Sequence, residues 1–161
     1  MKITPLMGEN CVRISPPGQY KQQYYPLMGG GERYIERSLK MARILVIDDE
    51  QAVRLFLREI LETDGHEVVD APDGKAGLRL FSEEPADLTI IDIFMPEKEG
   101  LETIRELRRE YPGVKIIAIS GGGGIGNFDF LHMAKRFGAL RTIAKPFEKK
   151  EMLDAVQEAL G

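Results

Sequence analysis

The sequence predicts an α/β protein with a doubly wound, five-stranded parallel sheet and helices on both faces. From Arg43 onward, short aliphatic runs alternate with longer segments in which apolar residues recur at helical spacing. The links between these segments are short, so right-handed crossovers place the helices on either side of a parallel sheet. These two observations carry the prediction of fold class.

The first predicted strand, Ile44–Ile47, is a continuous β-branched and aliphatic run. Such a run is typical of a parallel strand that is covered on both faces. The other predicted strands are equally short and apolar, and they are Glu67–Ala71, Leu88–Asp92, Val114–Ile119 and Leu140–Ala144.

The first predicted helix, Gln51–Thr63, has apolar side chains at helical spacing, and Gly65 lies where a helix terminator is expected. Each later strand is also followed by a segment of helical periodicity. These predicted helices are Gly74–Phe81, Leu101–Tyr111, Phe128–Phe137 and Lys149–Leu160.

Charge is divided unevenly along the 161 residues. Residues 1–40 hold six Lys and Arg against three Asp and Glu, whereas the remainder holds sixteen against twenty-three. An acidic body without a basic run repels phosphate backbones, so no direct nucleic-acid binding is expected.

No apolar run approaches the ~20 residues needed to cross a membrane. The single cysteine, Cys11, and the lack of a signal peptide favour a cytoplasmic protein.

Residues 1–40 are predicted to be a mostly disordered leader, because they contain proline and glycine clusters and no sustained apolar period. Met41 opens a segment that resembles a native start, so the leader could be a remnant of cloning or of a start codon assigned too early. A docking arm with one short helix around Tyr34, Ile35 and Leu39 is the alternative. Residues 41–161 form the predicted domain.

Polar residues gather at the ends of the predicted strands: Asp48 and Asp49 after the first, Asp92 at the end of the third, Ser120 after the fourth and Lys145 after the fifth. Parallel strands bring their carboxyl ends to one edge, where ligands bind in such sheets. Three converging carboxylates need a cation, and hard oxygen ligands favour Mg²⁺. The sequence therefore predicts a magnesium site at this edge.

Asp92 is the best candidate nucleophile, since it lies between the acidic pair and Lys145, where metal and ammonium could hold a phosphoryl group. The Ser120 hydroxyl could bind a further phosphoryl oxygen. Taken singly, each residue has an ordinary explanation: an Asp after a strand is often a helix N-cap, and a Lys before Pro or a Ser before Gly is often a loop residue. Their joint placement at four strand ends favours the phosphoryl site.

Four short segments carry these residues: IDDE at 47–50, IDIFMP at 91–96, ISG at 119–121 and AKPF at 144–147. Together they resemble the signature of two-component response-regulator receiver domains, of the single-domain chemotaxis-regulator kind. The resemblance spans residues 42–160. It implies a flavodoxin-like sheet with strand order 2-1-3-4-5.

By position, the resemblance implies that Asp92 is the phospho-acceptor. It also implies that Asp49 and Asp92 bind Mg²⁺ directly with the backbone carbonyl of Phe94, while Asp48 acts mainly through water. Lys145 would pair with the phosphoryl group, and Ser120 would move toward it. A cis peptide between Lys145 and Pro146, and a sensor histidine kinase or a phosphotransfer protein as donor, are also implied.

Two features depart from the family pattern. Thr142 stands where relatives commonly carry the aromatic residue that couples to the strand-four hydroxyl, so the usual ring movement is in doubt.

The link after Ser120 contains Gly121, Gly122, Gly123 and Gly124 and is about three residues longer than is common. Its spacing also satisfies a dinucleotide-binding fingerprint, but that fingerprint belongs in the first βα turn. A switch loop that follows Ser120 is the better interpretation.

The first functional hypothesis is a single-domain response regulator, because the chain stops after the fifth predicted helix. Its output would be contact with a protein target, its oligomeric state monomer or weak dimer, and its only chemistry self-phosphorylation from small donors and autodephosphorylation. A phosphorelay intermediate, an excised receiver of a larger protein, and a pseudo-receiver that serves as a binding module are the alternatives. An aspartyl-phosphate phosphohydrolase would need a general acid, usually an Asp two residues after Asp92, where Phe94 stands.

Overall fold

The computed structural model describes residues 21–22, 38–39, 41–95, 100–121 and 127–161, with side chains omitted for 127–131. The chain divides into two units, Met1–Met41 and Ala42–Gly161. In the first unit, β1 (Lys21–Gln22) pairs antiparallel with β2 (Ser38–Leu39). A helix through Leu39 is therefore wrong, because its backbone pairs with another segment. The predicted leader disorder, and Tyr34 and Ile35, lie outside the described residues.

The second unit contains a five-stranded parallel sheet in the order β4-β3-β5-β6-β7, which is the predicted 2-1-3-4-5 order. The strands are β3 (Arg43–Ile47), β4 (Glu67–Ala71), β5 (Leu88–Asp92), β6 (Ile116–Ser120) and β7 (Arg141–Ala144). The helices are α1 (Gln51–Thr63), α2 (Gly74–Glu83), α3 (Gly100–Glu110), α4 (Asn127–Arg136) and α5 (Lys149–Leu160). The predicted fold class is confirmed.

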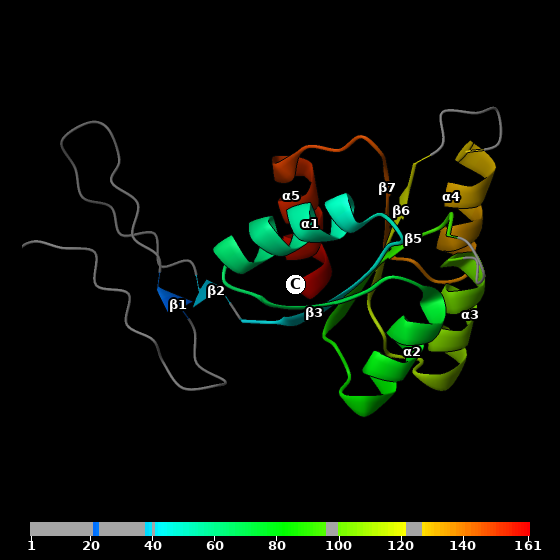
Figure 1. Ribbon diagram of the computed structural model, residues 1–161, viewed down its shortest axis with the longest axis horizontal. Helices are drawn as coiled ribbons and strands as arrows, with labels where there is room; N and C mark the ends of the chain where they lie inside the picture. Colours follow the sequence, from blue (N-terminus) through cyan, green and yellow to red (C-terminus); the bar gives the residue numbers. More distant parts are fainter. Residues whose placement is uncertain (1–20, 23–37, 40, 96–99, 122–126) are drawn as a thin grey trace, which may run out of the picture. The chain divides into compact units, whose positions relative to one another are not determined.

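Helices cover both faces of this sheet, with α1 and α5 on one side and α2, α3 and α4 on the other (Figure 1). Successive residues of a strand point to opposite faces, and β3 shows the consequence. Ile44 and Val46 pack with α1 and α5, whereas Leu45 and Ile47 pack in the opposite core. The continuous apolar run of β3 thus reflects burial on two faces.

For most of the helices and strands, the predicted and observed boundaries differ by one or two residues. The fourth strand was predicted to begin at Val114, but β6 begins at Ile116. Val114 instead closes the turn after α3, because its backbone N–H donates to the carbonyl of Tyr111 at 3.0 Å. A local apolar pattern cannot distinguish a residue that closes a turn from the first residue of a strand.

Within the described ranges, no helix is both long and apolar enough to span a bilayer.

Candidate functional site

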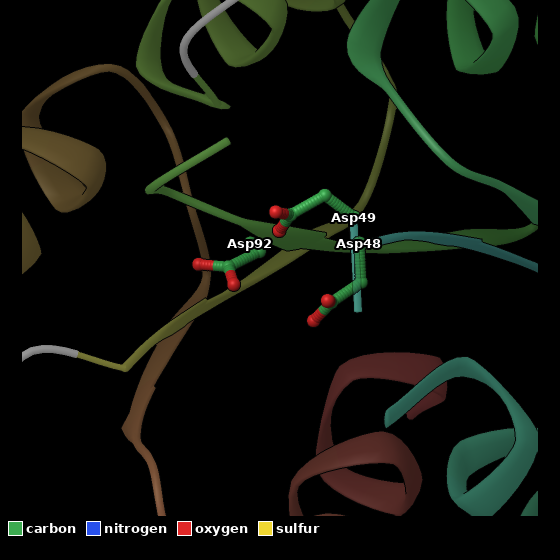
Figure 2. A group of neighbouring side chains, drawn as sticks. All are labelled: Asp48, Asp49 and Asp92. Atoms are coloured by element: carbon green, nitrogen blue, oxygen red, sulfur yellow. The ribbon is translucent and has the colours of Figure 1, made fainter. Parts of the chain in front are cut away.

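Neighbouring parallel strands bring the predicted site residues to one edge of the sheet. Asp48 and Asp49 follow β3, Asp92 ends β5, Ser120 ends β6, and Lys145 follows β7. Because β3, β5, β6 and β7 are adjacent and parallel, their carboxyl ends lie side by side. Figure 2 shows the three aspartates reaching the same region from two strands.

The three aspartates form a compact acidic cluster. One carboxylate oxygen from each of Asp48, Asp49 and Asp92 lies within 4.8 Å of the others. Asp48 and Asp92 are buried, at 0% and 3% exposure, whereas Asp49 is exposed. The donor set consists of hard carboxylate oxygens, one of them open to solvent, which suits an oxygen-seeking ion such as Mg²⁺ that retains several waters. The residues present therefore fit the predicted metal.

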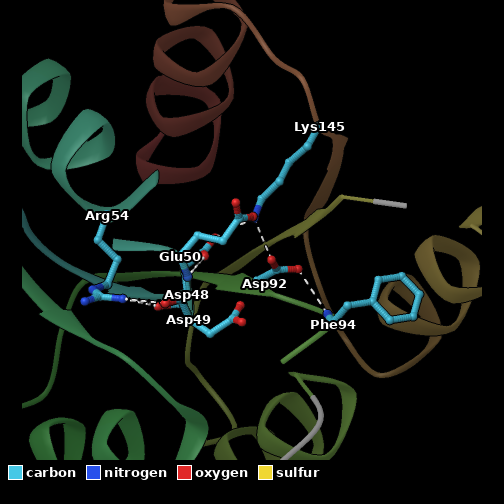
Figure 3. Close-up of polar contacts among 7 residues, drawn as sticks. All are labelled: Asp48, Asp49, Glu50, Arg54, Asp92, Phe94 and Lys145. Atoms are coloured by element: carbon cyan, nitrogen blue, oxygen red, sulfur yellow. Dashed lines mark hydrogen bonds and ion pairs between the residues drawn. The ribbon is translucent and has the colours of Figure 1, made fainter. Parts of the chain in front are cut away.

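Lys145 joins the strands of the site electrostatically. Its Nζ donates to Asp92 Oδ2 at 2.6 Å and to Asp48 Oδ2 at 2.8 Å, and also to Glu50 Oε1 at 3.0 Å (Figure 3). Burial alone would lower the pKa of Lys145, but the hydrogen bonds with Asp48 and Asp92 outweigh it and raise the pKa above its ordinary value. The ammonium therefore stays charged between the carboxylates.

Asp48 and Asp92 are also held by backbone N–H groups. The backbone N–H of Glu50 donates to Asp48 Oδ1 at 2.8 Å, and that of Phe94 donates to Asp92 Oδ1 at 3.0 Å. Burial raises the pKa of Asp48, and the bond from Lys145 opposes this shift without cancelling it. An added cation would stabilise the charged form of this buried carboxylate.

Ser120 and Lys145 are joined through the backbone, since the N–H of Lys145 donates to the carbonyl of Ser120 at 2.7 Å. The peptide between Lys145 and Pro146 is cis, as the resemblance implied. Gly121 lies against the same lysine: a Cβ at this position would be 2.9 Å from Lys145 Cδ. A side chain at residue 121 would therefore have to displace Lys145.

The structure describes only some of the remaining switch residues. Thr142 lies half-buried in β7, where it pairs with Ala118 of β6. Gly122, Gly123 and Gly124 lie outside the described residues. Phe94 lies two residues after Asp92, and its backbone N–H reaches the Asp92 carboxylate. Phe94 is 41% exposed, so its backbone lies near the acidic cluster while its ring reaches solvent.

Three residues of the site escaped prediction from sequence. Glu50 belongs to the first motif, but the motif does not indicate the contact between Glu50 and Lys145. Arg54 donates to the backbone carbonyls of Asp48 and Asp49. Arg54 lies in the first turn of α1, four residues after Glu50, and this spacing is the sequence signal that places its side chain near the acidic pair. Gly100 begins α3 so close to β5 that a Cβ would lie 1.9 Å from the carbonyl oxygen of Asp92.

Comparisons with known proteins agree with this geometry. The response regulator receiver domain family matches residues 44–157. The chemotaxis protein CheY of Halobacterium salinarum is 32% identical over 118 residues, which cover 73% of this chain and 96% of CheY. Sporulation initiation phosphotransferase F of Bacillus subtilis is 29% identical over 118 residues, which cover 73% of this chain and 93% of that protein.

Solved structures give the same result. A response regulator receiver domain protein from Clostridium thermocellum superposes with a TM-score of 0.69 at 33% identity, over 74% of this chain and 94% of its own. NtrX from Brucella abortus in complex with ADP gives a TM-score of 0.70 at 31% identity, but this chain spans only 27% of NtrX.

The fold and the acidic edge define a signalling module of two-component systems. The chain belongs to the response regulator receiver domain family.

Proposed function

We propose that this protein is a response regulator that accepts a phosphoryl group on Asp92. One observation carries the proposal: the Lys145 ammonium lies 2.6 Å from Asp92 Oδ2, in a cluster that also contains Asp48 and Asp49. A nucleophilic carboxylate, a fixed cation and a set of metal ligands are the parts that phosphoryl transfer requires, because catalysis there is mainly positioning and charge neutralisation.

In the proposed reaction, a carboxylate oxygen of Asp92 attacks the phosphorus of a phosphohistidine. The P–O bond forms as the P–N bond breaks, and the electron pair returns to the imidazole of the donor. Lys145, charged because its carboxylate partners raise its pKa, pairs with the incoming phosphoryl oxygens. Ser120, at the end of β6, is assigned to a further oxygen.

We assign Mg²⁺ to Asp48, Asp49 and Asp92 with the backbone carbonyl of Phe94. When bound, this ion neutralises charge on the transferring group. The chain itself supplies the converging carboxylates and the backbone N–H bonds that orient Asp48 and Asp92.

For its biological role, we propose a single-domain cytoplasmic regulator. Its donor would be a sensor histidine kinase or a phosphotransfer protein, its output contact with a protein target, and its state monomer or weak dimer. The match over 96% of the length of a chemotaxis protein supports this role. A recess of about 620 Å³ beside Lys145, lined by side chains that include Val53, Phe56 and Phe147, offers a surface for a protein donor.

A phosphorelay intermediate is the second candidate, favoured by the match to a sporulation phosphotransferase over 93% of that protein. Such an intermediate would pass its phosphoryl group to a second histidine protein, whereas a chemotaxis-type regulator would bind its target while phosphorylated. The match to 27% of NtrX keeps a receiver within a longer protein as a further alternative.

The test is incubation with Mg²⁺ and acetyl phosphate, followed by intact mass measurement. We expect one added phosphoryl group that is labile to base, lost in Asp92→Asn and suppressed by EDTA. Asp73→Asn is the matched control, since the described contact of the Asp73 side chain is the cap of α2, a 2.7 Å bond from the N–H of Ala76, and Asn caps equally well. A label that persists in Asp92→Asn, or equal uptake in EDTA, contradicts the proposal.

A further inference from the structure

Arg54 of α1 contacts the acidic pair, Asp48 and Asp49, on the side opposite to Lys145 (Figure 3). Its Nη1 donates to the carbonyl oxygens of Asp48 and Asp49, at 2.7 and 3.1 Å. Its side chain is 14% exposed, so these bonds are largely shielded from water. Figure 3 shows Arg54 and Lys145 on opposite sides of the pair. Lys145 thus holds Asp48 by its carboxylate, whereas Arg54 holds Asp48 and Asp49 by their backbone.

The geometry of the acidic pair explains why a backbone clamp is needed. Side chains of consecutive strand residues point to opposite faces, yet Asp48 and Asp49 direct their carboxylates to one cluster with Asp92. The chain must therefore turn after β3, whose pairing with β4 and β5 ends at Ile47. Carbonyl oxygens that leave a ladder need new donors. Nη1 of Arg54 donates to both carbonyl oxygens.

Asp70 of β4 fixes this guanidinium in turn. Arg54 Nε donates to Asp70 Oδ2 at 3.1 Å, and Arg58, one turn later on α1, pairs with the other oxygen of Asp70. Arg58 also donates to the carbonyl of Val68 at 2.8 Å and to Glu62 at 3.0 Å. Both arginines therefore join α1 to β4, but among their described contacts only Arg54 touches the acidic pair.

We propose that Arg54 is a positioning residue for metal binding, which holds the turn at Asp48 and Asp49 so that both carboxylates face the ion. This inference rests on the proposed metal site and adds a residue outside the ligand set. Residues that orient metal ligands commonly change metal affinity ~10–100-fold when removed.

A purely electrostatic role predicts the opposite sign. Arg54 carries a positive charge near the site, so its removal would reduce repulsion and strengthen the binding of a divalent cation. A positioning role predicts weaker binding, because the carboxylates lose their fixed orientation. The direction of the change in Mg²⁺ affinity separates the two roles.

The experiment is a Mg²⁺ titration of backbone amide NMR signals, which also reports whether each variant is folded. Arg54→Met is expected to raise the Mg²⁺ dissociation constant by ~10-fold or more. Arg58→Met is the matched control: it removes the same charge and an equivalent contact with Asp70, so its dissociation constant should stay unchanged or fall. Equal weakening in both variants would overturn the positioning role.

Arg54→Lys keeps the positive charge. It provides a second test of the inference in case Arg54→Met does not fold. A single ammonium cannot reproduce the fork that serves two carbonyls and Asp70, so we expect a weakened affinity and a phosphorylation rate that saturating Mg²⁺ restores. Wild-type affinity in Arg54→Lys and in any folded Arg54→Met would overturn the inference while the proposed function stands. A wild-type protein that fails to bind Mg²⁺ would overturn both.

Discussion

Lys145 and His66 show how the surroundings of a single side chain determine its charge. Lys145 is enclosed by carboxylates, and their hydrogen bonds raise its pKa despite burial. His66, which is 9% exposed, has weaker support: its Nδ1 accepts from the N–H of Ala42 at 3.4 Å, and its Nε2 lies 3.6 Å from Asp64. Burial lowers the pKa of His66, and the charges of Asp64 and Asp87 only partly oppose the shift.

This lowered pKa predicts a loss of stability in acid. Above the ordinary value of 6.5, His66 is neutral in both states and adds no pH dependence. Below it, the unfolded chain binds the proton more readily than the native protein, so the free energy of unfolding falls. Urea unfolding at about pH 5 and about pH 8 should show a smaller loss on acidification in His66→Gln than in the wild type.

His132 provides the control for this measurement. It is an exposed residue of α4, so His132→Gln is the same substitution made at the surface rather than in the interior. An identical acid loss in His66→Gln and the wild type would show that other groups, such as the buried aspartates, account for the dependence.

At the scale of elements, β6 lies between β5, which carries the proposed acceptor, and β7, which carries Thr142. Thr142 of β7 pairs with Ala118 of β6, and Ser120 ends β6 beside Lys145. Thr142 is half-buried and lacks the aromatic ring common among relatives. We therefore propose that the switch comprises Ser120, Thr142 and the glycine run from Gly121 to Gly124, and that the signal travels by loop movement.

Beryllofluoride, a phosphoryl mimic, provides the test of this switch. With Mg²⁺ present, it should slow amide hydrogen exchange in residues 121–127 and alter exchange around Thr142, because a Ser120 drawn toward the mimic orders the glycine run. Asp92→Asn should show no response. Unchanged exchange in the saturated wild type would contradict the switch, while leaving phosphorylation itself untouched.

At the scale of the whole molecule, the described core belongs to the second unit. Within the described residues, both core clusters are built from residues 42–160. We propose that residues 1–40 are a leader that adds nothing to the fold, and that residues 41–161 form an independent receiver domain. The charge division along the chain agrees with this arrangement.

Deletion of residues 1–40 should therefore change the melting temperature by less than ~3 °C and leave phosphorylation intact. Thermal unfolding followed by circular dichroism measures the first, and acetyl phosphate labelling the second. Leu57→Ala sets the scale, since Leu57 is fully buried and its truncation should cost ~2–5 kcal/mol. A fall comparable to that of Leu57→Ala would show that the leader docks on the domain.

Much of the fold followed from the sequence alone, because its determinants are local. Apolar runs such as Ile44–Ile47 and the helical period of Gln51–Thr63 predicted the element types, and the handedness of crossovers predicted a parallel sheet. Because parallel strands bring their carboxyl ends to one edge, the sequence also placed Asp48, Asp92 and Lys145 together. Boundaries such as Val114 were less certain, because a ladder begins only where a neighbouring strand supplies its partners.

The sequence by itself thus determined the doubly wound class and the residue types at the strand ends. Only the tertiary structure decided how those residues meet. Lys145 lies 95 positions from Glu50 yet bonds to it, and Arg54 reaches back to Asp48 and across to Asp70. Such contacts, and the pKa directions that burial imposes on Asp48 and His66, depend on packing between distant segments, which no local pattern encodes.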